Sequence, residues 1–129
     1  DNYPNGNDKY YDDVHLRTTS LYTKYKELDG SWGNWSEKII LKTAIIIYIE
    51  RNKISILSDV TYRYTNYDIV GINSVRKNVD GNDWEFDCID EDGISCRIIH
   101  SISTNKDLMS QFRIEYSDEK KVYNVNREN

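Results

Sequence analysis

The chain has 129 residues, which is room for one domain with one modest core. Sixteen isoleucines and eleven tyrosines stand against a single alanine, so the composition favours strands and excludes a helical bundle. The formal net charge is −5 and no run of Lys or Arg is longer than a pair, which argues against nucleic acid or an anionic membrane as partner. The longest apolar run, residues 44–49, is far below the roughly 20 residues that an integral membrane segment needs.

Residues 1–29 are expected to form an N-terminal tether or lead-in with little regular structure. The first eight residues are polar and turn-rich, and the stretch from Leu16 to Leu28 could be a short helix or an extended lead-in. Position 1 is Asp rather than Met, so we expect a mature exported chain. The opening segment also resembles the one that follows the lipidated cysteine of exported bacterial lipoproteins, which implies a periplasmic or cell-surface tether.

Residues 30–129 are expected to form an antiparallel β domain. Short alternating runs are separated by turn clusters about every 8–12 residues, which predicts about eight strands in a barrel or a sandwich. The early strands are predicted from Trp32 or Trp35 to Leu41, at Thr43–Glu50 and at Lys53–Ser58, the last two joined across Arg51-Asn52 with Glu50 facing Lys53 as an ion pair.

The middle of the chain continues this alternation. Val60, Tyr62 and Tyr64 alternate with polar residues, which predicts a half-buried strand with these three on one face. A glycine inside a strand usually marks a bulge or bend, which we expect at Gly71. The chain is then expected to turn at residues 80–83.

The clearest element is a hairpin between Trp84–Asp90 and Ile94–Ser103. With a three-residue loop and Gly93 in the left-handed region, Asp90 faces Ile94. A two-residue turn would shift the pairing by one residue and mix charged with apolar side chains, so the pattern selects the longer loop. The predicted apolar face comprises Trp84, Phe86, Cys88, Ile94, Cys96, Ile98 and Ile102. A last pair of strands is predicted at 108–116 and 121–126.

In this register Cys88 and Cys96 lie opposite each other. Cβ atoms of such a pair are about 4.5–5.5 Å apart, so a cross-strand disulfide is within reach. A pair of buried thiols in the core explains the pattern equally well. The spacing does not fit a zinc site and no His lies at ligand spacing, so we expect no metal.

Motifs for catalysis and cofactor binding are missing from the sequence. There is no Gly-x-Ser-x-Gly, no glycine-rich phosphate loop and no His-Glu-x-x-His. The two histidines are His15 in the lead-in and His100, which is expected opposite Trp84. We therefore expect no enzyme, no catalytic residues and no cofactor. The carboxylates that facing strands could bring together are Glu37, Glu50 and Glu115.

Aromatic side chains are the best candidates for a binding site, because they combine a large contact area with a polar group. The candidate ligand-binding residues are Trp32, Trp35, Tyr48, Tyr62, Tyr64 and Trp84.

Gly30-Ser31-Trp32 follows the lead-in and opens the antiparallel meander. It resembles the Gly-x-Trp that begins the first strand of lipocalin-like (calycin) barrels, a family that places a basic residue near its last strand over that Trp. Arg113 or Arg127 could play this part. The resemblance covers residues 30–127 in strand count and order, and it implies a small barrel, open at one mouth, around an apolar cavity. A β-sandwich explains the same periodicity.

Two functions follow as hypotheses. The first is a non-enzymatic exported binding domain that holds a small apolar ligand inside the barrel, although the low apolar content weighs against a large cavity. The alternative is a protein-interaction module, such as an inhibitor or immunity-like protein, whose acidic surface meets a basic partner. An enzyme of unknown class ranks third.

Overall fold

The computed structural model describes residues 13–73, 76–78, 81–104 and 109–128. These residues form ten strands, and none of them lies in a helix that could cross a membrane. The strands are β1 (Val14–Tyr25), β2 (Ile39–Ile40), β3 (Ala44–Tyr48), β4 (Lys53–Leu57), β5 (Tyr64–Ile72), β6 (Arg76–Asn78), β7 (Gly81–Ile89), β8 (Ser95–Ser103), β9 (Ser110–Glu115) and β10 (Glu119–Arg127).

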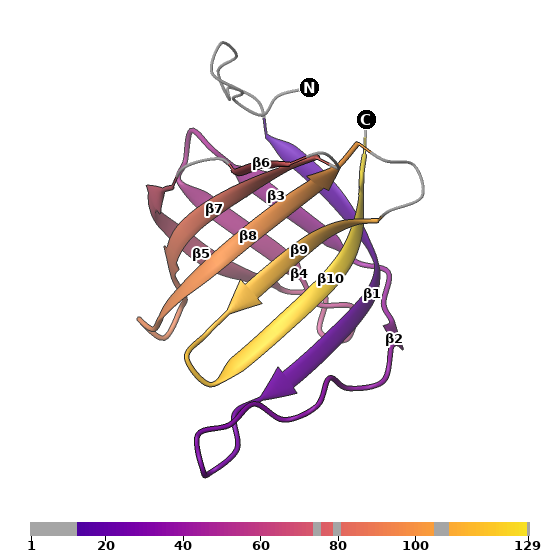
Figure 1. Cartoon of the computed structure of the whole chain (residues 1–129). Coiled ribbons are helices and arrows are strands. Elements are labelled where there is room, and N and C mark those ends of the chain that lie inside the picture. The colour runs from indigo at the N-terminus through magenta and orange to yellow at the C-terminus, as the bar shows by residue number, and fades with distance from the viewer. Residues whose placement is uncertain (1–12, 74–75, 79–80, 105–108, 129) are drawn as a thin grey trace.

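The sheet closes on itself into an antiparallel barrel (Figure 1). Strands β3, β4, β5, β7, β8, β9 and β10 pair in this order, and β1 joins β3 to β10. The described part of the barrel wall therefore has eight strands, with β2 outside on β1 and β6 outside on β7. Because the β1–β10 pairing leaves no second sheet, the predicted barrel is confirmed and the sandwich is excluded.

The prediction of little regular structure before residue 30 was wrong for β1. Val14–Tyr25 is the longest strand and pairs with β10 from Leu16 opposite Arg127 to Tyr25 opposite Glu119. Its register shifts between Thr18 and Ser20, and both of these polar residues are buried. A bulge and buried hydroxyls hide the apolar alternation on which the prediction depended. The predicted tether, residues 1–8, lies outside the described residues.

An irregular segment replaces the predicted strand from Trp32 or Trp35 to Leu41. Residues 31–38, here called the strap, run beside the C-terminal half of β1, and only Ile39–Ile40 is a strand. The Gly33 amide donates to the Tyr25 carbonyl at 2.8 Å and the Ser36 amide to the Thr23 carbonyl at 2.7 Å. The strap thus lies beside β1 where β3 does not reach.

The β3–β4 hairpin has a wider turn than predicted. Tyr48 faces Lys53, and the amide of Asn52, at φ +51°, donates to the Ile49 carbonyl at 3.1 Å. Glu50 lies in the turn, so the expected Glu50–Lys53 pair does not form.

Residues 58–63 form a turn rather than a half-buried strand. The Tyr62 amide donates to the Ser58 carbonyl at 3.0 Å, and Tyr62 has φ +56°. The Ser58 hydroxyl accepts the amides of Val60 and Thr61 at 3.2 Å each, which supports the turn over the strand. The three predicted face-sharing residues, Val60, Tyr62 and Tyr64, are all exposed.

The register of the β7–β8 hairpin is confirmed. The Asp90 amide donates to the Ile94 carbonyl at 2.9 Å, Gly93 has φ +79°, and Cys88 lies opposite Cys96. The bulge at Gly71 is also confirmed, because the β5–β7 register shifts there. Two details were wrong. Ile94 is exposed because it lies at the loop rather than in the barrel wall, and Gly81–Asp83 belongs to β7 rather than to a turn.

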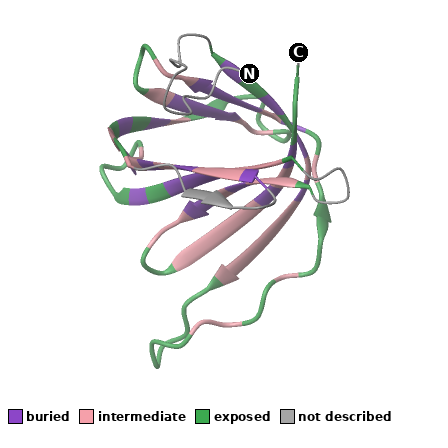
Figure 2. Ribbon diagram, turned by 45° about the horizontal axis from the view of Figure 1, so that its top comes forward, coloured by how far each residue is buried: buried purple, intermediate pink, exposed green. Residues whose placement is uncertain are grey.

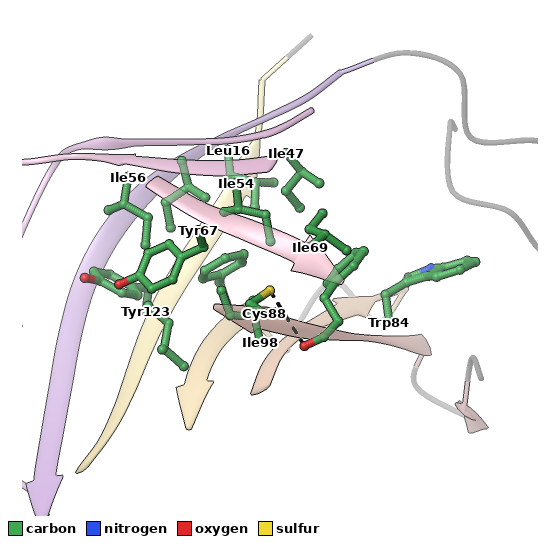
Figure 3. Packing of buried hydrophobic residues seen from close by; sticks show 14 of the residues in the cluster. Leu16, Ile47, Ile54, Ile56, Tyr67, Ile69, Trp84, Cys88, Ile98 and Tyr123 are labelled. Carbon is green, nitrogen blue, oxygen red and sulfur yellow. Dashed lines mark hydrogen bonds between the residues drawn. The ribbon is translucent and has the colours of Figure 1, made fainter. Parts of the chain in front are cut away.

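The barrel interior is filled with side chains. Buried and exposed residues alternate along the strands, as the colours of Figure 2 show. Phe86 and Phe112 are fully buried in the core, among aliphatic side chains from all around the barrel. Figure 3 shows the hydroxyls of Tyr67 and Tyr123 at one end of this core and Trp84 at the other.

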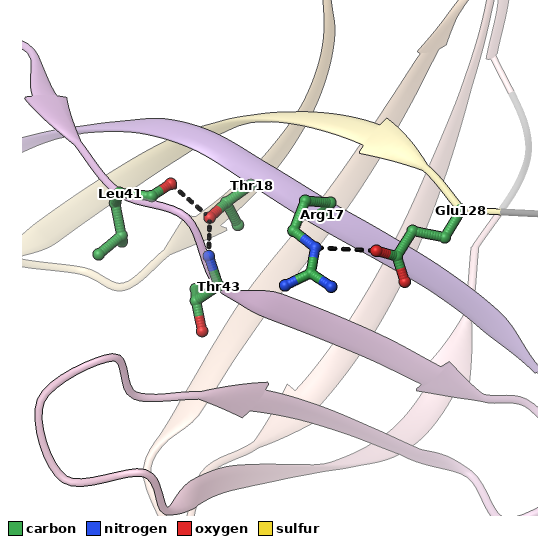
Figure 4. A network of polar contacts seen from close by, with 5 residues as sticks. All are labelled: Arg17, Thr18, Leu41, Thr43 and Glu128. Atoms are coloured by element: carbon green, nitrogen blue, oxygen red, sulfur yellow. Dashed lines mark hydrogen bonds and ion pairs between the residues drawn. The ribbon is translucent and has the colours of Figure 1, made fainter.

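A buried hydroxyl holds β1 to the segment between β2 and β3. The Thr18 hydroxyl donates to the Leu41 carbonyl at 2.7 Å and accepts the Thr43 amide at 2.8 Å (Figure 4). These bonds add to two backbone hydrogen bonds at the same place, from the Thr18 amide to the Thr43 carbonyl at 2.9 Å and from the Leu41 amide to the Thr19 carbonyl at 3.2 Å. Nearby on the surface, Arg17 pairs with Glu128 at 2.8 Å.

Replacing Thr18 by Val should therefore lower the free energy of unfolding by about 2 kcal/mol, because a buried amide and carbonyl lose their partner. Thr18→Ser keeps the hydroxyl and loses only one methyl group, for about 1 kcal/mol. Urea unfolding measures both variants. Equal stability of the two would contradict a role for the hydroxyl.

Candidate functional site

The mouth of the barrel lies between the ends of β4 and β5 and the facing strand β10. It encloses about 220 Å³, lined by Leu41, Thr43, Ile56, Leu57, Ser58, Asp59, Thr65, Tyr67, Lys121 and Tyr123. Burial, with smaller contributions from the charges of Glu119 and Asp59, raises the pKa of Tyr123 to about 12, so its hydroxyl stays protonated. The mouth is smaller than the roughly 300–1,000 Å³ of typical ligand pockets.

The outer face of the barrel carries a row of charges across five strands. The pairing register places Asp87, Arg97, Glu115, Lys120 and Lys24 side by side, on β7, β8, β9, β10 and β1. Asp87, Arg97 and Glu115 point outward, because their chain neighbours Cys88, Cys96 and Ile114 are buried in the core. Signs alternate along the row until its last two members, which are both lysines.

A larger hollow lies at the basic end of this row. It has a volume of about 470 Å³, and we call it the groove; its lining residues are Tyr22, Trp35, Ser36, Gln111, Arg113, Glu115, Lys120, Lys121 and Val122. Strands β9, β10 and β1 supply most of the lining, and the strap adds Trp35 and Ser36 as a wall. The Ser36 hydroxyl accepts the Thr23 amide at 3.0 Å, which ties this wall to β1.

Tryptophan rings and lysines stack beside the groove. The Lys24 ammonium lies 4.5 Å from the centre of the Trp35 ring, and the Lys120 ammonium 4.5 Å from that of Trp32. Lys26 lies 5.4 Å from Trp32 on the same patch. Such contacts are worth about 0.5–1 kcal/mol at exposed positions.

Arg113 adds a buried donor to the groove. Its Nε atom is buried and has no hydrogen-bond partner within the part of the chain that the structure describes. In the β-sheet register Arg113 stands between Ile99 and Val122. A guanidinium in this position can donate hydrogen bonds to a carboxylate or phosphate.

A third, more open hollow of about 480 Å³ lies on the other side of Glu115, beside Cys88 and Cys96. Its cation, Arg97, already has Asp87 at 4.0 Å. Both cysteines are buried on facing strands, and no disulfide joins them in this structure. Burial raises the pKa of Cys88 to about 12 and that of Cys96 to about 11, so neither is an activated nucleophile.

The aromatic residues predicted as a binding site do not share one cavity. Trp32 and Trp35 come together on the outer face with the lysines. Tyr48 lies at the opposite end of the barrel, 5.1 Å from the Arg51 guanidinium. Tyr62 and Tyr64 are exposed where β4 turns into β5, and Trp84 is buried in the core.

Sequence reasoning missed Lys120, which lines the groove, and Lys24, which lies beside it. These two lysines come together because the first strand pairs with the last, and β1 was not predicted as a strand. Trp32 also differs from the expectation drawn from lipocalin-like barrels. It lies on the outer face after β1, and the basic residue over its ring is Lys120 rather than Arg113 or Arg127.

The remaining candidate groups lie apart. His100 is opposite Trp84 as predicted, and His15 is exposed on β1. The three carboxylates considered for a catalytic pair sit on separate elements, with Glu37 in the strap, Glu50 in the β3–β4 turn and Glu115 on β9. Among the described residues, no three His, Cys, Asp or Glu side chains are grouped to hold a metal ion.

Comparison of the chain with family models, curated proteins and solved structures finds no match. The eight-stranded antiparallel barrel is consistent with a lipocalin-like architecture, and this likeness rests on the strand arrangement alone.

Proposed function

We propose that the protein is a non-enzymatic binding domain whose ligand is a small organic molecule held in the groove. The observation that carries this proposal is a hollow of about 470 Å³ with an indole wall and converging polar groups. This volume lies within the usual range of ligand pockets, about 300–1,000 Å³.

The barrel interior supports ligand binding less well. Phe86, Phe112 and the surrounding aliphatic residues fill the core, and the mouth offers only about 220 Å³. The small apolar ligand expected inside the barrel is therefore replaced in this proposal by a ligand on its outer face.

The chemistry of the barrel favours binding over catalysis. Burial raises the pKa of both thiols, and it lowers the pKa of His100 to about 3, so these groups are uncharged at neutral pH and lie inside the wall. A nucleophile or general base works best with a pKa near the working pH and access to substrate.

NMR titration with small aromatic compounds tests the proposal. We expect amide shifts at Trp35, Arg113 and Val122, and at least about tenfold weaker binding in Trp35→Ala, because this exposed ring supplies the wall. Tyr62→Ala removes another exposed ring, outside the groove, and should leave the affinity unchanged. Shifts confined to the mouth, or no shifts at all, would refute the proposal.

A protein-interaction role has one specific observation in its favour. Asp83, Glu85 and Asp87 alternate along β7 with the buried Trp84 and Phe86, which places three carboxylates outward on one strand of an acidic chain. This role requires a basic partner whose complex weakens steeply with salt and with Glu85→Gln. Calorimetry at low and high salt measures both effects.

Export and tethering at a periplasmic or cell-surface membrane also stay proposals. Their support is the polar, turn-rich composition of residues 1–8. Fractionation of cells that express the complete gene product tests them, and recovery of the protein with the cytoplasm would contradict them.

A further inference from the structure

The lysines around the groove form no ion pair within the described part of the chain. Lys24 and Lys120 are direct cross-strand partners, an arrangement of like charges that destabilises a sheet. In that part, neither lysine has a carboxylate within 4.0 Å, and the same holds for Lys26. The chain as a whole carries −5, so this concentration of positive charge is local.

Tryptophan rings hold these cations in place without neutralising them. Lys24 and Lys120 each lie 4.5 Å from an indole centre. The ring quadrupole attracts the ammonium, but the ring carries no net charge, so the full positive charge remains available to a ligand. The indole rings thereby hold the two lysines side by side, although the like charges of the lysines repel each other.

Arg113 points to the same kind of ligand by independent evidence. A buried donor without a partner is costly, and the Nε of Arg113 is such an atom among the described residues. A guanidinium binds a carboxylate or phosphate through two parallel hydrogen bonds. An anion in the groove would accept hydrogen bonds from Arg113. It would also weaken the repulsion between Lys120 and the neighbouring Lys24.

On the basis of the proposed function, we infer that the groove binds a planar organic anion. Its anionic group lies near Arg113 and Lys120, and its ring packs against the exposed indole of Trp35. Glu115, which also lines the groove, repels additional negative charge and so favours a singly charged ligand.

Three probes with one ring system and different charges test this inference. Indole-3-acetate is an anion, indole-3-acetamide is neutral and tryptamine is a cation at neutral pH. Calorimetry should give indole-3-acetate the highest affinity, about tenfold above the amide, because only the anion pairs with the cations. Amide shifts should place it at Arg113 and Lys120.

Matched variants separate the groove from a general effect of charge. Lys120→Gln should weaken binding of indole-3-acetate about threefold to tenfold, and Glu115→Gln should strengthen it about threefold. The control is Lys53→Gln, because Lys53 also lies near an aromatic ring, 5.7 Å from Tyr48, at the other end of the barrel. The affinity of the Lys53→Gln variant for indole-3-acetate should match that of the unchanged chain.

The outcomes distinguish the two proposals. If none of the three probes shifts groove residues and no other aromatic compound does, the proposed function falls. If the amide or tryptamine binds in the groove as tightly as the acid, the binding domain stands and the anionic ligand is refuted. Equal losses in Lys120→Gln and Lys53→Gln would also refute it.

Discussion

Gly81→Ala is expected to lower the free energy of unfolding by about 4 kcal/mol. Gly81 has φ +153°, and a Cβ atom placed on it would lie 1.8 Å from the backbone oxygen of Ile102 on the neighbouring strand. A backbone carbonyl in a ladder cannot move aside without breaking pairing between β7 and β8. Steric overlap and an unfavourable backbone conformation therefore add together.

Gly71→Ala is the matched control, because it makes the same chemical change at the bulge of β5. The added Cβ would meet only the Asp87 side chain, at 3.6 Å, which is an ordinary contact. This variant should be neutral or up to about 0.5 kcal/mol more stable, since alanine restricts the unfolded chain. Urea unfolding compares the two, and a similar loss in both would contradict the close approach at Gly81.

Acidification is expected to destabilise the barrel through His100. This side chain lies fully buried inside the barrel beside Phe112. Burial, and to a lesser extent the charge of Arg127, lowers its pKa from 6.5 to about 3. The unfolded chain binds a proton near pH 6.5 and the folded chain does not, so stability is greatest above pH 6.5 and falls as the pH decreases towards 3.

The size of this effect follows from about 1.36 kcal/mol for each pH unit. We expect a loss of about 2 kcal/mol between pH 7 and pH 5 and of about 4 kcal/mol near pH 3. His100→Gln removes the titrating group, so its stability should change by about 2 kcal/mol less than that of the unchanged chain between pH 7 and pH 5. Parallel pH profiles of the two proteins would show that His100 is not the cause.

The fold could be predicted wherever local alternation and turn chemistry agree. The β7–β8 hairpin is the best example, because Gly93 and the sorting of charged from apolar side chains allow only one register. Strands β3 and β4 were predicted for the same reason, since they are short apolar runs on either side of a turn.

Strand β1 escaped prediction for a physical reason. Thr18 and Ser20 are polar but buried, and the register shift between them moves the following residues to the opposite face. Periodicity assumes that polar residues face solvent and that the pleat is unbroken. The Thr18 hydroxyl can be buried because it forms hydrogen bonds with the Leu41 carbonyl and the Thr43 amide. These partners come together only in the folded chain.

The candidate site was predictable only in its aromatic half. Trp32 and Trp35 stood out by residue type, whereas Lys24 and Lys120 become neighbours only when the first strand pairs with the last. No local pattern indicates that closure. Nothing in the sequence distinguishes these lysines from other surface residues, and the acidic net charge of the chain does not indicate a local basic patch.

A crystal structure of the protein with indole-3-acetate tests most directly whether the groove is the binding site. We expect the ring to lie against Trp35 and the carboxylate to lie within hydrogen-bond distance of Arg113 or Lys120, with Phe86 and Phe112 still filling the barrel interior. A ligand seated instead at the mouth between Tyr67 and Tyr123, or inside an opened core, would contradict it.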